Sequence, residues 1–113
     1  MASYLLQVAY TPQAWAALLK NPHDRTQALK PVLEKLGGRF ETAYFAFGDY
    51  DVVAVLELPK DTDAAAFSIA AAAGGAIKAI KTTPLMSIAD GISAIEKAGR
   101  IGYVSPTGEA AGV

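Results

Sequence analysis

The sequence predicts an α+β domain with the ferredoxin-like βαββαβ layout and one extra helix at its C-terminal end. Two observations support this fold class. Four short apolar stretches have the composition of strands, and the stretches between them carry helical stripes, start signals and glycine stops. Their order along the chain is β-α-β-β-α-β, followed by a last helix. In this layout the first and third strands are central and the second and fourth are edges.

The first half of the domain contains one strand and a helical region in two pieces. Residues 3–10 form a strand that is largely apolar on both faces. Thr11 and Pro12 then give a helix start, with a hydroxyl cap before a proline at the first helical position. Asn21 and Pro22 repeat this signal, so we expect a second helical piece to begin there. Pro31 should kink that piece or mark its true beginning.

A hairpin forms the centre of the prediction. Residues 39–47 and 50–58 are expected to be strands two and three, joined by a turn over residues 48–51. Residues 52–56 are apolar on both alternating sets, which is typical of a strand covered on both faces. Strict alternation along residues 39–47 places Tyr44 on the same face as Phe40, and Phe45 on the other face.

The second half repeats the pattern and adds a tail. Residues 61–73 are expected to be a helix, residues 76–83 an edge strand ended by Pro84, and residues 87–99 a last helix. We expect residues 1–99 to be one domain. Residues 100–113 form a C-terminal tail, partly flexible or packed on a partner subunit, with a short strand at 101–104.

Composition excludes several classes of function. The net charge is −1 with a pI of about 5.7, which argues against nucleic acid or an anionic membrane as partner. With no cysteine and one histidine, neither a disulfide nor an imidazole-rich or thiolate metal site is available. We therefore expect no metal site and no cofactor. A spanning helix and a leader segment are also not expected, so the predicted location is the cytoplasm.

The predicted sheet has a second apolar face that the predicted helices do not cover. Helices lie on one face in this layout, yet leucine and valine also occur at the alternate strand positions. An exposed apolar sheet of this size is unusual for a soluble monomer. The predicted partner is therefore a second copy of the chain, sheet against sheet, in a homodimer or a larger homo-oligomer.

Several motifs make the chain similar to the GYD domain family. They are Gly48-Asp49-Tyr50-Asp51 before the valine-rich strand, Thr11-Pro12, Asn21-Pro22 with Asp24-Arg25, residues 33–38 and residues 81–85. The resemblance covers about residues 3–98. It implies a dimeric α/β-barrel made of two ferredoxin-like subunits. The wider fold group includes cofactor-free monooxygenases, muconolactone-isomerase-like enzymes, haem-handling proteins and sensory modules, so fold alone does not select a function.

Three residues are candidates for catalysis. His23 is the only histidine and lies at a helix joint, where it would be a general base, a haem ligand or simply a solvated first-turn residue. Tyr50 and Asp51 would form an acid–base pair at a pocket mouth. Alternatively, Asp51 accepts main-chain N–H groups in the turn and Tyr50 packs as a hairpin aromatic residue.

Three further residues are candidates for ligand binding: Trp15, Tyr44 and Lys81. Each also has a structural explanation, Trp15 as an anchor of the first helix, Tyr44 as a packed aromatic residue, and Lys81 as a guard on an edge strand. The preferred function is binding of a small organic molecule between sheet and helices. The alternatives are a cofactor-independent isomerase or monooxygenase acting on an aromatic or enolic substrate, and a purely structural assembly protein.

Overall fold

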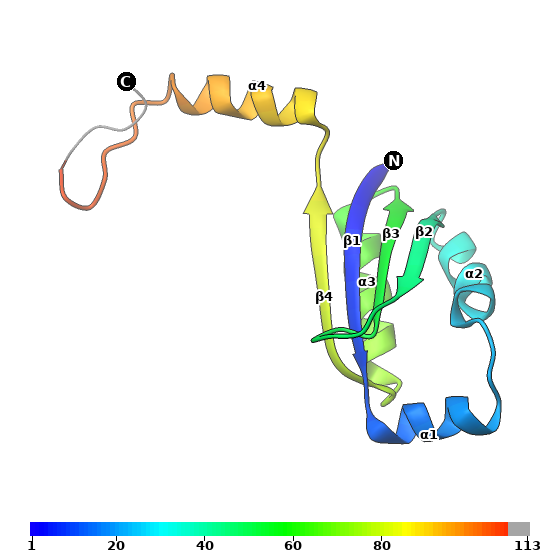
Figure 1. Ribbon diagram of the computed structural model, residues 1–113. Helices are drawn as coiled ribbons and strands as arrows, with labels where there is room; N and C mark the ends of the chain where they lie inside the picture. The colour runs from blue at the N-terminus through cyan, green and yellow to red at the C-terminus, as the bar shows by residue number, and fades with distance from the viewer. Residues whose placement is uncertain (109–113) are drawn as a thin grey trace.

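The computed structural model describes residues 1–108, and the predicted order of elements is confirmed (Figure 1). Residues 109–113, the end of the predicted tail, lie outside the described part. All four strands form one antiparallel sheet in the order β2-β3-β1-β4, so the predicted central and edge strands are also confirmed. The elements are β1 (Ala2–Tyr10), α1 (Pro12–Lys20), α2 (Arg25–Lys35), β2 (Arg39–Phe45), β3 (Val52–Leu58), α3 (Asp61–Ala73), β4 (Ile77–Leu85) and α4 (Ile88–Ala98).

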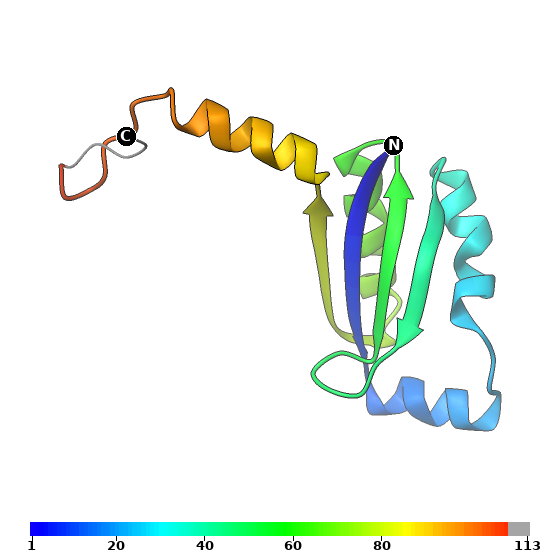
Figure 2. The same ribbon diagram turned by 45° about the horizontal axis from the view of Figure 1, so that its top comes forward.

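The core lies between one face of the sheet and the helices α2 and α3, while α1 crosses the end of β1 (Figure 1, Figure 2). We call the covered side the helix face and the other side the open face. Alternate residues of the two central strands point to the helix face because successive side chains of a strand point to opposite sides. The buried core cluster consists of Tyr4, Leu6, Val8, Leu33, Ala54, Leu56, Leu58, Ala64 and Phe67.

A bulge in β2 changes which aromatic residues share a face. Phe40 pairs with Leu56, but the next pair is Thr42 with Val55, so one extra residue of β2 lies between them. The strand therefore places Phe40 on the helix face together with Phe45, and Tyr44 on the open face. The prediction that Phe40 and Tyr44 share a face was wrong, because alternation does not continue through a bulge.

The start of α2 and the end of β4 differ from the prediction. Helix α2 begins at Arg25, because the carboxylate of Asp24 accepts a hydrogen bond from Thr26 N and caps the helix. Pro31 lies inside α2, so of the two predicted alternatives it does not mark the beginning of the helix. Pro84 lies within β4, where it pairs with Tyr4; an edge strand tolerates proline because one side needs no donor.

The turn from α2 into β2 needs two glycines. Gly37 has a φ of 80°, a left-handed conformation that favours glycine. A Cβ atom on Gly38 would clash with the main-chain oxygen of Glu57 and the side chain of Leu58. This close approach lets β2 enter the sheet directly beside β3.

Helix α4 is an arm that extends away from the sheet (Figure 1, Figure 2). None of its residues is buried, and its stripe of Ile88, Ile92 and Ile95 is 52–82% exposed. The radius of gyration is 18.2 Å, whereas a compact chain of this length has about 13 Å. In the tail that follows, only Val104 has a strand-type bridge, so the expected strand at 101–104 is not formed.

Candidate functional site

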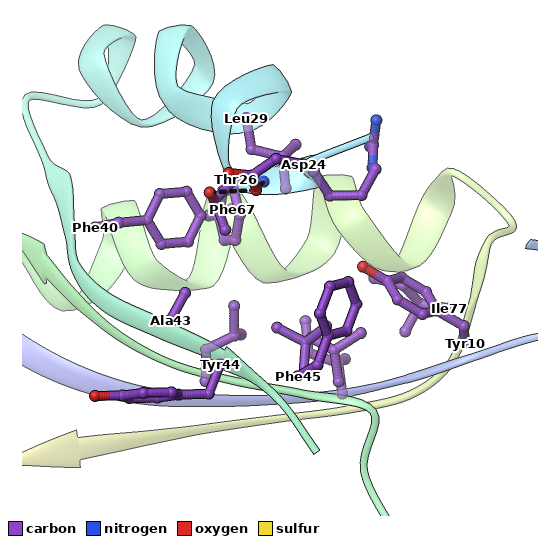
Figure 3. Close-up of a pocket in the computed structure, with 15 residues that line it drawn as sticks. Tyr10, Asp24, Thr26, Leu29, Phe40, Ala43, Tyr44, Phe45, Phe67 and Ile77 are labelled. Atoms are coloured by element: carbon purple, nitrogen blue, oxygen red, sulfur yellow. Dashed lines mark hydrogen bonds between the residues drawn. The ribbon is translucent and has the colours of Figure 1, made fainter. Parts of the chain in front are cut away.

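A cavity of about 290 Å³ lies between the helix face of the sheet and the helices α2 and α3 (Figure 3). The sheet side chains reach it from all four strands, and Leu29 and Phe67 reach it from the two helices. The space exists because Ala43 and Val52 are small for positions that face two helices. Its lining residues are Leu6, Val8, Tyr10, Asp24, Arg25, Thr26, Leu29, Phe40, Ala43, Tyr44, Phe45, Val52, Phe67, Ile77 and Ile80.

Tyr10 supplies a polar group at one end of the cavity, opposite Phe40 (Figure 3). Its main-chain N–H donates a hydrogen bond of 2.8 Å to Asp51 Oδ2. Its ring meets the edge of Trp15 at a centroid distance of 5.4 Å, and Trp15 in turn lies 6.5 Å from the ring of Phe45. The backbone and ring of Tyr10 are thus positioned from two sides, and its hydroxyl points into the cavity.

The first turn of α2 brings two charged residues to the cavity, Asp24 and Arg25. Asp24 is the cap of the helix, and its Oδ1 accepts hydrogen bonds from Thr26 N at 2.9 Å and Thr26 Oγ1 at 2.6 Å. Arg25 follows as the first helical residue and is half-buried. The site therefore combines long apolar walls with a small polar end.

Electrostatics keep the polar groups in defined protonation states. The hydrogen bonds from Thr26 hold the pKa of the Asp24 carboxyl below its usual range, so it is ionised at neutral pH. Burial raises the pKa of the Tyr10 hydroxyl. The positive charge of Arg25 opposes this rise, and the negative charge of Asp51 reinforces it. The Tyr10 hydroxyl therefore keeps its proton at neutral pH and is available as a donor.

His23 lies beside a second, smaller cavity. This space of about 150 Å³ is bounded by α1 and by the segment that joins α1 to α2, and Tyr10 and Arg25 line it as well. His23 is exposed, and its Nδ1 lies 2.8 Å from the main-chain oxygen of Asn21. It does not line the larger cavity, so the structure does not bring it together with the apolar site.

The structure places Tyr50 and Asp51 in the β2–β3 connection. The carboxylate of Asp51 accepts a hydrogen bond from the main-chain N–H of Tyr10. The main-chain N–H of Asp51 donates to Val8 O at 2.7 Å, and its main-chain oxygen accepts from Ala46 N at 2.8 Å. These bonds fasten the hairpin loop to the end of β1. Neither residue lines the larger cavity. A catalytic role for His23, Tyr50 or Asp51 stays a prediction.

The three predicted ligand-binding residues are spread over the molecule. Trp15 packs on Tyr10, which lines the cavity, but does not line the cavity itself. Tyr44 borders the cavity, but its ring is on the open face and 68% exposed (Figure 3). Lys81 pairs with Gln7 and is also exposed on the open face. Their role in ligand binding stays a prediction.

Sequence reasoning missed Tyr10 and Arg25 as residues of the site. Tyr10 was visible only as the last residue of the first strand, and Arg25 only as part of an Asp24-Arg25 motif. The useful signal is their position, since Tyr10 ends the central strand β1 and Arg25 begins α2, two elements that line the cavity. Among residues 1–108 there is no group of three or more His, Asp or Glu side chains that could hold a metal ion.

Comparison with known proteins gives a family and no individual relative. The model of the GYD domain family matches residues 4–95. Neither the comparison with curated proteins nor that with solved structures found a match. No helix in the described part of the chain is long and apolar enough to cross a membrane.

Proposed function

The chain belongs to the GYD domain family, and we propose that it is a homo-oligomeric protein that binds a small organic molecule in the cavity between sheet and helices. The observation that supports this function is the cavity itself. Close-packed protein interiors leave few voids larger than a water molecule. The space of about 290 Å³ lies against that interior and is partly open to solvent, so a small molecule can reach it from outside.

The walls of the cavity fit a binding role. Ligand pockets are mostly apolar, with a few polar groups that orient the ligand. Here ten of the lining residues are aliphatic or Phe, and only a few, among them Tyr10, Arg25 and Asp24, bring a polar side chain. A binding role also agrees better with the geometry than catalysis does, because the predicted acid–base residues are outside the cavity.

Two unpartnered apolar surfaces support a homo-oligomer. The open face of the sheet carries Leu5, Val53 and Val55 along its two central strands, with no described element above it. The arm α4 presents its isoleucine stripe to solvent. Burying apolar surface is the main favourable term in association. A second copy presents the same surfaces, so two copies can cover them reciprocally, as a two-fold interface requires.

The binding role is tested by filling the cavity. Toluene serves as a neutral apolar probe, and its binding is followed by NMR titration of the intact protein. We expect binding to the original protein and its loss in Ala43→Leu, which places three more carbon atoms in the cavity. The matched control is Ala66→Leu on the exposed side of α3, which should bind toluene normally.

Two outcomes count against the binding role. One is the absence of toluene binding to the original protein, and the other is equal binding by Ala43→Leu and by the control. Light scattering tests the assembly separately, since one chain has a mass of 11.8 kDa. A mass of a single chain at micromolar concentration would contradict the homo-oligomer and leave the binding result unaffected.

A further inference from the structure

The polar end of the cavity contains a positive charge without a negative partner. Arg25 lines the cavity and is half-buried. Among residues 1–108 the one ion pair joins Arg39 to Glu57 on the open face, at 2.9 Å. The guanidinium of Arg25 has neither an ion-pair nor a hydrogen-bond partner in that part of the chain. A partly buried charge without a partner is costly, and a bound anion would remove that cost.

Asp24 is close in sequence but is already engaged. Its carboxylate accepts two hydrogen bonds from Thr26 and caps α2. Arg25 and Tyr10 line the cavity together, and the positive charge of Arg25 opposes the rise in the pKa of the Tyr10 hydroxyl, so the two side chains are neighbours there.

Tyr10 supplies a second donor beside this charge. Its hydroxyl points into the cavity (Figure 3) and has no hydrogen-bond partner among the described residues. Its main chain is held by Asp51 and its ring by Trp15, so little freedom is lost when the hydroxyl binds a ligand. A guanidinium with five N–H donors and a neighbouring O–H suit the oxygens of a carboxylate.

The remainder of the cavity limits the size and polarity of the ligand. Beyond the polar end the walls are apolar, with Phe40 and Phe67 among them. The volume of about 290 Å³ corresponds to roughly ten water molecules at liquid density. A ligand of about that number of non-hydrogen atoms fits, with a compact apolar body and one polar end.

We infer that the cavity binds a small organic anion, an aromatic or short aliphatic carboxylate, whose charged group lies between Arg25 and Tyr10. This inference rests on the proposed binding function and adds the chemical class of the ligand. The body of the carboxylate lies among the apolar side chains, and its charge replaces the missing partner of Arg25. Charge-assisted hydrogen bonds make this end the main source of selectivity.

The test compares ligands of one shape and different charge. Isothermal titration calorimetry with benzoate and benzamide measures the value of the negative charge, because the two molecules have nearly the same size. We expect benzoate to bind at least about tenfold more tightly than benzamide. Arg25→Gln should weaken benzoate binding about ten- to hundredfold and leave benzamide binding nearly unchanged. Tyr10→Phe should weaken benzoate binding less, because only one neutral donor is lost.

The control variant and toluene separate this inference from the binding role. Arg39→Gln removes an arginine of the open face and should not change benzoate binding. If toluene and benzamide bind as well as benzoate, the cavity is a binding site and the anion inference is wrong. The same conclusion follows if Arg25→Gln binds benzoate normally, or if Arg39→Gln weakens binding as much as Arg25→Gln does. If no probe binds, both proposals are wrong.

Discussion

The two faces of the sheet are formed by the same strands, but helices of the chain cover only one of them. On the helix face, Leu56 is 1% exposed beneath the helices. Its neighbour Val55 points the other way, to an open face that no described helix covers. The helix face is thus completed within the chain, apart from a cavity. The difference teaches that alternate residues of one strand can complete the core on one side and leave an apolar surface uncovered on the other.

The largest effect is expected on the open face. Val55→Glu places a carboxylate at the centre of the surface that a second copy would cover. An unpaired buried charge costs several kcal/mol, so the variant should dissociate and lose much of its stability. Light scattering and chemical denaturation check both effects. Glu57→Gln is the control at the rim of the same face. If Val55→Glu keeps the mass and stability of the original protein, this face is not an interface.

The neighbouring residue tests the helix face. Leu56→Ala removes three carbon atoms from a fully buried side chain and should lower the free energy of unfolding by about 2–5 kcal/mol. Because Leu56 does not touch the open face, the folded variant should keep its oligomeric mass. Denaturation and light scattering on one sample separate the two effects. A change in mass without a change in unfolding would invalidate the distinction between the faces.

The hydrogen bond that joins the β2–β3 hairpin to Tyr10 should have a smaller effect on stability. Asp51→Ala leaves the Tyr10 N–H without its acceptor, which should cost about 1–3 kcal/mol. Asp51→Asn keeps an acceptor oxygen and should cost less. Asp49→Ala, at an exposed position of the same loop, should have little effect on urea denaturation. Equal stability of Asp51→Ala and Asp49→Ala would show that the bond to Tyr10 does not stabilise the fold.

The sequence predicted the elements well because each has a local cause. Short runs that are apolar on both alternating sets indicated β1 and β3, and the hydroxyl of Ser87 marked the start of α4, where it accepts a hydrogen bond from Asp90 N. The bulge in β2 could not be predicted, since it depends on pairing with β3. The position of α4 was equally hidden, because its isoleucine stripe indicates a partner without identifying one.

The site was predicted only as a place between sheet and helices. Its polar end forms where β1 and α2 meet in space, and Tyr10 and Arg25 are far enough apart in sequence that no spacing links them. The histidine and the aspartate that the sequence offered as catalytic candidates do not line this site. Asp51 bonds the end of β1, and His23 lies on a separate, smaller cavity. The catalytic candidates of the sequence therefore lie near the larger cavity but do not line it, and their role stays a prediction.

The smallest effect concerns a polar contact beside the buried core of the helix face. The Tyr4 hydroxyl donates a hydrogen bond of 2.6 Å to Asp61 Oδ1 in the first turn of α3. This bond, with burial as the second cause, raises the pKa of Tyr4 from 10.0 to about 12. A raised pKa means that the folded protein binds this proton more tightly than the unfolded chain does. The stabilisation is therefore complete below pH 10 and is lost as the pH rises toward 12.

Tyr4→Phe isolates this contribution, because the ring stays in the core and only the hydroxyl is removed. At neutral pH the variant should be less stable by about 0.5–1.5 kcal/mol, the net value of one hydrogen bond. Between pH 10 and 12 the original protein should lose more stability than the variant, so the two curves approach each other. Thermal unfolding at several pH values measures both, with Tyr103→Phe in the exposed tail as the control. Parallel curves for the original protein and Tyr4→Phe would show that the Asp61 contact does not control the titration of Tyr4.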